Sequence, residues 1–536
     1  MPGRAGLVLA AVLALAPVAA TAEDGGRMDH ILQRGRLIVG VKVDYPPWGM
    51  VAPDGTIVGL EPDLARDAAD GLGVGLELVP VTAGNRLQRL TQGQIDLVIA
   101  TLGDTAERRN MAGLIQPNYY ASGVSLLARA DSPFREWAQV RGRPICLNEG
   151  AYFNRLLIER YLIDPVIFPN TRDALMALGH GRCVGWAFDD TVIAQLLTAS
   201  EWSAYGMAMP VILGAPWSIA VRKEEKNTAF GRFASDLVAH WHRSGRLVAL
   251  QAKWGLPPSD YLAAQQAVWS RDRDGRPVCS RDPAGSWPPA CLGGEAARSA
   301  AAAGPAWAQR LRAATGLDLA PLVDPLNQAR LWRGAALTLA LSLAAIVGAL
   351  AIGVTLAWLD SVIALSPLGR AIGLPLRGLV AVARMTPPIL QLYILLFGLG
   401  GLLAANTGWT PGSFLVAAVV LSVYAGATNA VLLRTALARL RREHRGTAPL
   451  WLIPAAIDRC YDGLEATLVN IVKAVALAST IGVPEIVSAV NAILAEGADA
   501  APMMNLLLVF YFLFDLAVLL ALRAGRSAVR RLAWMA

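Results

Sequence analysis

Two patterns of apolar and polar positions divide the chain. From residue 36 to about residue 250, short apolar runs such as 37–43 and 95–100 alternate with amphipathic stretches of helical period such as 64–72. Short apolar runs bounded by turn residues indicate buried strands, and amphipathic stretches indicate helices that cover a sheet. This part of the chain is therefore predicted to fold as a soluble α/β domain.

After residue 331 the apolar stretches become much longer. Five of them have about the 20 residues that a helix needs to cross the hydrocarbon of a membrane; they are 334–358, 379–402, 412–433, 464–483 and 503–522. The pattern predicts an all-α membrane bundle of five transmembrane helices. A soluble domain and a membrane bundle are then joined in one polypeptide.

The flanking segments complete the expected organisation. Arg4, an apolar run and the small residues 20–22 form the pattern of a cleavable export signal, with an uncleaved anchor as the alternative. Residues between the two domains are rich in Pro, Gly, Ala and Arg, which is typical of a linker. The predicted divisions are a signal peptide at 1–22, the soluble domain at 28–265, the linker at 266–330 and the membrane domain at 331–530.

The net charge of +7 gathers beside the apolar stretches, chiefly as arginines at 434, 439, 441, 442, 445, 523, 526, 530 and 531. Cytoplasmic loops of membrane proteins carry such an excess of Lys and Arg. An exported N-terminal domain followed by five spans places these arginines in the cytoplasm. The chain is thus predicted to be a multi-pass protein of the bacterial inner membrane with its N-terminal domain in the periplasm, and not a nucleic-acid binder.

Four of the five cysteines form two candidate pairs. Cys279 and Cys291 flank a Pro/Gly-rich loop, and Cys146 and Cys183 fall in one predicted lobe. An exported domain meets an oxidising compartment in which disulfides can form. Buried or unpaired thiols are an equally good interpretation of both pairs.

Two stretches carry the chemistry expected of an amino acid receptor. A free amino acid presents a carboxylate and an ammonium, so its receptor needs a fork-shaped cation and a facing anion in a site that closes. Residues 93–108 end an apolar run in polar residues and Arg108, and residues 181–190 end another in Asp189 and Asp190. The sequence therefore offers one candidate group for each end of a zwitterion.

Over residues 36–255 the sequence resembles the periplasmic solute-binding proteins of polar amino acid importers, of the family 3 type. The matching segments keep the order and spacing of that family; they are 39–41 with 45–48, 54–64, 96–108, 118–120 and 181–189. The resemblance implies two α/β lobes that are joined by two crossover strands and close over the ligand like a hinged clamp.

The resemblance also implies roles for individual residues. Arg108 would hold the ligand carboxylate with help from Thr101 and Gly103, and Asp189 would hold the ammonium, with Asp190 as a competitor. Tyr45 would cover the ligand, although Tyr45 and Trp48 also fit as core aromatics. Two departures are visible: Tyr152, after Ala151, stands near the place of a hydroxyl residue, and Gly103 stands where Ser or Thr is common. The predicted ligand-binding residues are thus Tyr45, Trp48, Thr101, Gly103, Arg108, Tyr152 and Asp189.

The last 200 residues resemble the permease family that serves the same importers, for histidine, glutamine, glutamate and arginine. The resemblance rests on residues 334–339, 383–388, 452–456 and 472–486. It implies a membrane homodimer or heterodimer driven by a cytoplasmic ATPase. The departure is in the segment 434–454, which is shorter than in that family and lacks its Glu-Ala-Ala signature for docking the ATPase.

No Gly-x-x-x-x-Gly-Lys-Ser/Thr phosphate loop occurs in the chain, so ATP hydrolysis would require a separate ATPase subunit. No His/Cys cluster has zinc spacing, and neither an enzyme nor a cofactor is expected. The leading hypothesis is a fused solute-binding and permease subunit of an ABC-type importer for an amino acid or a similar small zwitterion. The alternatives are a membrane-tethered ligand sensor with no ATPase and, less favoured, a ligand-gated channel.

Overall fold

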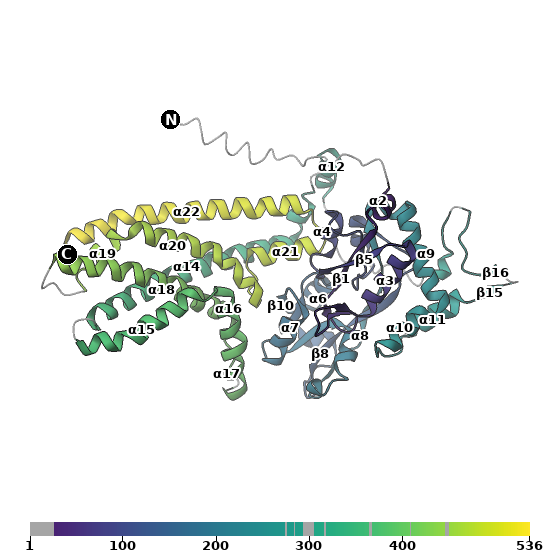
Figure 1. The fold of residues 1–536 in the computed structure, drawn as a ribbon, viewed down its shortest axis with the longest axis horizontal. Helices are drawn as coiled ribbons and strands as arrows, with labels where there is room; N and C mark the ends of the chain where they lie inside the picture. The colour runs from purple at the N-terminus through teal and green to yellow at the C-terminus, as the bar shows by residue number, and fades with distance from the viewer. Residues whose placement is uncertain are drawn as a thin grey trace.

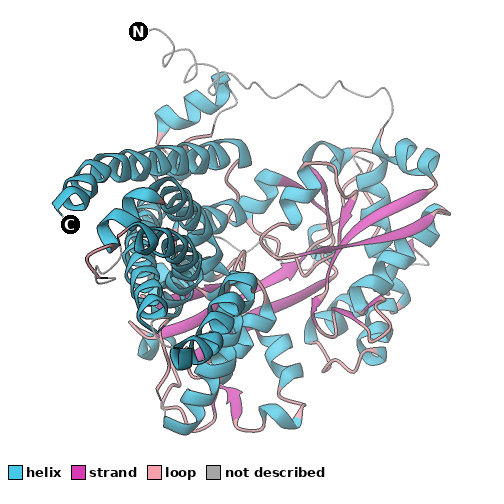
Figure 2. Cartoon of the chain, turned by 60° about the vertical axis from the view of Figure 1, so that its left-hand side comes forward, coloured by secondary structure: helices cyan, strands magenta, loops and turns pink. Residues whose placement is uncertain are grey.

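The computed structural model describes residues 26–273, 276–283, 285–292, 305–315, 318–363, 367–407, 409–444 and 450–535. The predicted signal peptide therefore lies outside the described residues. Figure 1 shows a domain of strands and helices at one end of the long axis and a bundle of long helices along the rest. Figure 2 shows the bundle helices foreshortened beside the strands of that domain.

The first lobe is built on a five-stranded sheet in the order β5-β1-β6-β14-β7. Strand β1 pairs in parallel with β5 on one side and β6 on the other, with Gly40 opposite both Val79 and Val98. The sheet carries buried apolar side chains on both faces, as expected where helices cover a parallel sheet. Its strands are β1 (Arg36–Lys42), β5 (Gly75–Val81), β6 (Leu97–Val98), β7 (Ala112–Leu114) and β14 (Ala220–Arg222).

The second lobe has a sheet in the order β10-β9-β11-β8-β12, with β13 also paired to β8. The chain enters this lobe through β8 and leaves it through β13, and the backbone N–H of Tyr119 donates to the carbonyl of Trp217 at 2.9 Å where the two crossings meet. The predicted two-lobed α/β architecture is confirmed. The strands are β8 (Tyr120–Arg129), β9 (Pro144–Asn148), β10 (Asp164–Phe168), β11 (Gly185–Asp189), β12 (Tyr205–Met207) and β13 (Ile212–Trp217).

Short elements complete the domain. A three-stranded sheet of β2 (Asp44–Tyr45), β3 (Gly49–Val51) and β4 (Ile57–Val58) follows β1 and places Tyr45 at the cleft. The helices are α2 (Arg27–Arg34), α3 (Leu60–Leu72), α4 (Arg86–Thr91), α5 (Ala106–Met111), α6 (Asn154–Tyr161), α7 (Thr171–Gly179), α8 (Asp190–Leu196), α9 (Ala229–Ser244), α10 (Arg246–Lys253) and α11 (Asp260–Trp269).

Both candidate cysteine pairs are disulfide-bonded, Cys146 with Cys183 and Cys279 with Cys291. The second bridge lies beyond α11 and after the hairpin of β15 (Asp272–Arg273) and β16 (Arg276–Pro277). It packs with the fully buried Trp269 against α9 of the first lobe. Packed structure thus continues past residue 265, where the linker was predicted to begin.

Among the described residues of the bundle, four helices are long and apolar enough to cross a membrane: α14 (Pro325–Ile363), α18 (Ser413–Glu443), residues 461–481 and residues 500–527 of α22. The predicted second span is not straight, because residues 373–385 and 388–404 form a pair bent by 106°. Pro387 and Pro388 lie at the bend, where each removes a backbone donor. If that pair is one span, the bundle has five.

The remaining helices lie around these spans. They are α12 (Ala306–Thr315), α13 (Ala320–Val323), α15 (Pro367–Met385), α16 (Pro388–Tyr393), α17 (Gly400–Thr407), α19 (Ile453–Arg459), α20 (Tyr461–Ala474), α21 (Ile486–Ala495) and α22 (Ala500–Met535). Figure 1 shows α21 and the start of α22 beside the two-lobed domain, while α19 and α15 lie at the far end. Arginines pair with acidic residues at that far end, as Arg526 does with Asp462 at 2.7 Å.

Candidate ligand site between the two lobes

Arg108 reaches from the first lobe into the second. It lies on α5, and its backbone N–H donates to the side-chain oxygen of the N-cap residue Thr105. Its guanidinium donates to the carbonyl of Gly103 at 2.9 Å and to that of Gly150, in the second lobe, at 2.8 Å. The side chain is only 5% exposed, so this contact holds the two lobes together at a buried point.

The charge of Arg108 has no protein carboxylate to balance it. Within the described segments, no Asp or Glu forms an ion pair with its guanidinium, and two carbonyls are its only hydrogen-bond acceptors. Burial, and secondly the nearby charge of Arg86, lowers the pKa of Arg108 to about 9. Because a guanidinium has five N–H donors, Arg108 keeps donors for a bidentate anion such as a carboxylate.

Asp189 is the facing anion. It ends strand β11 of the second lobe, and the hydroxyl of Tyr45 from the first lobe donates to one of its oxygens. The other oxygen, Oδ1, is buried without a hydrogen-bond partner among the described residues. Burial raises the pKa of Asp189 to about 6. A ligand ammonium at Oδ1 would supply the missing hydrogen bond.

Asp190, the alternative acid, is already engaged inside the second lobe. Its Oδ1 accepts from the hydroxyl of Ser122 at 2.6 Å and from the backbone N–H of Gly123 at 2.9 Å. These bonds fix α8 on strand β8. Of the two neighbouring acids, Asp189 therefore has the geometry of a ligand-binding residue.

Two other predicted residues, Trp48 and Thr101, differ in what they offer. Trp48 is fully buried and packs edge-on against Tyr120 and Trp217, with ring centroids 4.4 and 4.7 Å away, so it belongs to the hinge core. The backbone N–H of Thr101 already donates to Glu61 Oε1 at 2.5 Å, which leaves its hydroxyl as the group available to a ligand.

Tyr152 and Gly103 face each other across the cleft. A Cβ atom at Gly103 would lie 3.2 Å from Cδ1 of Tyr152, so a larger residue at this position would press on the ring. The Tyr152 hydroxyl donates to the carbonyl of Leu213 at 2.7 Å. This bond holds the ring of Tyr152 in the second lobe next to the guanidinium of Arg108.

A group of buried charges beneath the cleft was not predicted from the sequence. Lys42 is 3% exposed, with Nζ 3.6 Å from the ring centroid of Tyr45, and Glu61 is fully buried and accepts from the hydroxyl of Tyr119 at 2.5 Å. Arg86 is also buried and donates to the carbonyls of Ala100 and Thr101. Burial lowers the pKa of Lys42 to about 8 and raises that of Glu61 to about 7. The only signal in the sequence was the position of each residue: Lys42 ends a strand, and Glu61 and Arg86 lie at the starts of helices.

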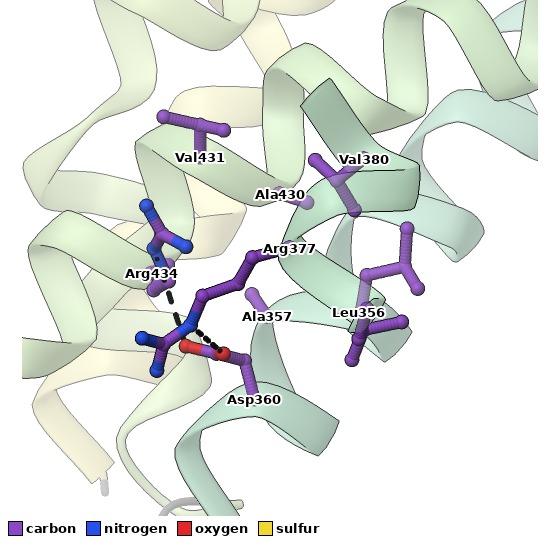
Figure 3. A pocket seen from close by; sticks show the side chains of 9 residues that line it. Leu356, Ala357, Asp360, Arg377, Val380, Ala430, Val431 and Arg434 are labelled. Carbon is purple, nitrogen blue, oxygen red and sulfur yellow. Dashed lines mark hydrogen bonds and ion pairs between the residues drawn. The ribbon is translucent and has the colours of Figure 1, made fainter. Parts of the chain in front are cut away.

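A second polar cluster lies at the far end of the bundle, around a small cavity (Figure 3). Asp360 of α14 accepts from Arg377 Nε at 2.7 Å and lies 4.0 Å from Arg434 Nε of α18. The cluster ties α15 to α14 and α18. Neither here nor elsewhere in the described segments do three His, Cys, Asp or Glu side chains gather as a metal site would require.

Comparisons with known proteins concern the two-lobed part of the chain. Residues 37–257 match the family of bacterial extracellular solute-binding proteins, family 3. The L-cystine-binding protein TcyJ of Escherichia coli (strain K12) is 24% identical over 239 residues, 43% of this chain and 86% of that protein. The glutamine-binding protein of Geobacillus stearothermophilus is 27% identical over 207 residues, 37% of this chain and 78% of that protein.

Among solved structures, a mutant of ArgBP from T. maritima is 28% identical, covers 42% of this chain and 98% of its own, and has a TM-score of 0.40. The relatives align with the two-lobed part, and the apolar helices that follow it fit a membrane bundle. Residues 37–257 thus resemble the bacterial extracellular solute-binding proteins, family 3.

Proposed function

We propose that the chain is a fused solute-binding and permease subunit of an ABC-type importer for an amino acid or a similar small zwitterion. In this proposal the ligand carboxylate binds Arg108 and its ammonium binds Asp189. Two of the relatives are an L-cystine-binding protein and a glutamine-binding protein.

One observation carries the proposal: two opposite charges, one from each lobe, are buried in the same cleft with their ligand-facing groups unmatched. Arg108 has no carboxylate partner in the described part of the chain, and Asp189 Oδ1 has no donor. Buried ions without partners are costly, so such a site favours a ligand that carries both complementary charges. A zwitterion supplies an anion and a cation at once.

The membrane half is proposed to be the permease. Its support is the series of apolar helices joined to the binding domain, together with the family resemblance of residues 472–486. A tethered receptor meets its permease at a high effective concentration, of the order of millimolar for a short linker. ATP hydrolysis would come from a separate cytoplasmic subunit that drives a dimer of such bundles.

The binding step is tested by calorimetry of the purified full chain against the twenty amino acids. We expect at least one to release heat at a one-to-one ratio, and Arg108→Ala to abolish that heat while the circular dichroism spectrum is unchanged. Absence of binding by every amino acid would refute the proposed ligand class. Retained affinity in Arg108→Ala would show that the carboxylate binds elsewhere.

The transport step needs a separate experiment. Uptake of the bound amino acid into vesicles should require both ATP and the matching ATPase. The shortened segment 434–454 favours the second candidate function, a membrane-tethered sensor that has lost its ATPase. Co-purification of a nucleotide-binding subunit would support the importer, and uptake indifferent to ATP would remove it.

A further inference from the structure

The loop between α21 and α22 contacts both lobes of the binding domain. At Gly497, whose φ of +118° favours glycine, a Cβ atom would lie 2.5 Å from Sδ of Met111 in the first lobe. The preceding residue, Glu496, lies 3.9 Å from Arg155 of the second lobe. One short segment, residues 496–498, therefore bridges the mouth of the clamp; we name it the bridging loop.

The two contacted helices lie close to the contact of Arg108 with Gly150. Met111 ends α5, the helix that carries Arg108. Arg155 lies in the first turn of α6, shortly after Gly150, whose carbonyl accepts from Arg108. A movement of either helix during ligand binding therefore reaches the bridging loop directly.

An ionic network joins the loop to the bundle and the second lobe to the residue before α14. Glu496 Oε1 accepts from Arg330 of α14 at 2.7 Å, and Arg155 donates to Asp324, just before α14, at 2.7 Å. The exposed fractions of the Arg155 and Arg330 side chains are 13% and 14%, so these pairs are shielded more than ordinary surface pairs. The loop has a fixed place from which it can detect a movement of the lobes.

The structure shows the lobes closed. Gly150 of the second lobe lies so near Ala83 of the first that a Cβ atom would be 2.6 Å from the Ala83 carbonyl group, and the backbone N–H of Thr171 donates to Asp44 Oδ2 at 3.1 Å across the cleft. Opening the hinge would carry α5 and α6 apart. A three-residue loop cannot follow both.

We propose that the bridging loop senses closure of the clamp, because it can contact α5 and α6 together only while the lobes are closed. This inference deepens the proposed importer function and rests on it for its biological meaning. The second lobe has further contacts with the bundle, from Asp173 to the hydroxyl of Tyr393 at 2.9 Å and from His180 to Gly401. Opening the clamp thus frees the first lobe from the bundle while the second stays docked.

The test compares two cysteine pairs in the full chain with Cys460, the free cysteine, changed to serine. Met111→Cys with Gly497→Cys reports the first-lobe contact, and His180→Cys with Gly401→Cys is the matched control on the second lobe. A short bifunctional thiol reagent measures the cross-linking rate of each pair. Two wedge variants hold the clamp open without any ligand: Gly150→Leu, beside Ala83, and Gly84→Leu, whose Cβ would lie 3.2 Å from Glu149 Oε1.

We expect both wedges to slow the 111–497 cross-link by about tenfold or more, since closed forms then become a minor population, and to leave the 180–401 rate unchanged. An unchanged 111–497 rate would overturn the inference. Loss of both cross-links with the wedges would also overturn it, because the loop would then report docking and not closure. The inference would also be overturned if neither cysteine pair cross-linked in the protein without a wedge substitution.

These experiments contain no amino acid, so they can support the closure-sensing role even if the proposed ligand class is wrong. In a further arm, the amino acid that binds in calorimetry should speed the 111–497 reaction alone. A ligand that binds and leaves this rate unchanged would overturn the sensor role while the proposed binding function stands.

Discussion

Replacement of Arg108 by alanine separates ligand binding from fold stability. In the liganded clamp, the change would leave a buried carboxylate without its cation and would remove the bond to the Gly150 carbonyl across the cleft. Truncating one partner of a buried, hydrogen-bonded charge pair costs about 2–5 kcal/mol. At about 1.4 kcal/mol for each tenfold change in affinity, the dissociation constant should rise by roughly 30- to 4000-fold.

The same substitution should act differently on the unliganded protein. Its cation is buried beside Arg86 with no carboxylate partner, and burial lowers the pKa of Arg108 to about 9. Removing such a charge relieves a desolvation cost that offsets the two lost bonds to carbonyl oxygens. We therefore expect the thermal unfolding midpoint of unliganded Arg108→Ala to be unchanged or higher, although its affinity for the amino acid is much lower.

Calorimetry and thermal unfolding measure these two effects on the same preparation. Arg108→Lys keeps the charge without the planar fork and should give an intermediate loss of affinity. Asn110→Ala, at an exposed position of the same helix, is the matched control and should bind as the parent does. An affinity of Arg108→Ala within threefold of the parent would refute the carboxylate role of Arg108.

Three further predictions concern pH and docking. Burial raises the pKa of Asp189 to about 6, so affinity should be highest above that pH and should fall below it as the carboxylate takes up a proton; calorimetry of Asp189→Asn should show weak binding with no such dependence. Burial at the lobe junction raises the pKa of Glu149 from 4.5 to about 7, so its protonated form favours the closed fold, and thermal stability should decline as pH rises between those values; an identical decline in Glu149→Gln would contradict this. Glu496→Gln removes the carboxylate that binds Arg330 and lies near Arg155, so it should slow the 111–497 cross-linking, and an unchanged rate would show that these ion pairs do not hold the loop.

The periodic parts of the fold could be predicted from the sequence because the solvent of each segment dictates its pattern. Strand β1 is buried along most of its length and helix α3 buries one face, and these requirements appear directly as an apolar run and as apolar spacing. The spans α14 and α18 had to be apolar over a length that covers hydrocarbon. The angle of the bend in the second span could not be predicted, because prolines indicate that a helix breaks but not by how much it turns.

The proposed clamp residues were predictable only where they lie in a recognisable stretch of chain. Arg108 and Asp189 each follow an apolar run that ends in polar residues, so both could be named in advance. Lys42, Glu61 and Arg86 could not, because each looks like an ordinary surface charge until the fold buries it.

The sequence by itself determined the two-part organisation, the α/β lobes and the apolar membrane helices, since these follow from whether a segment must face water, a core or lipid. Only the tertiary structure decided which charges lose their water and what remains to satisfy them. It assigned Asp190 to the lobe interior and Asp189 to the cleft, and it brought α5, α6 and the bridging loop together from three distant parts of the chain. Such choices depend on burial and distance, which neighbouring residues in a sequence do not encode.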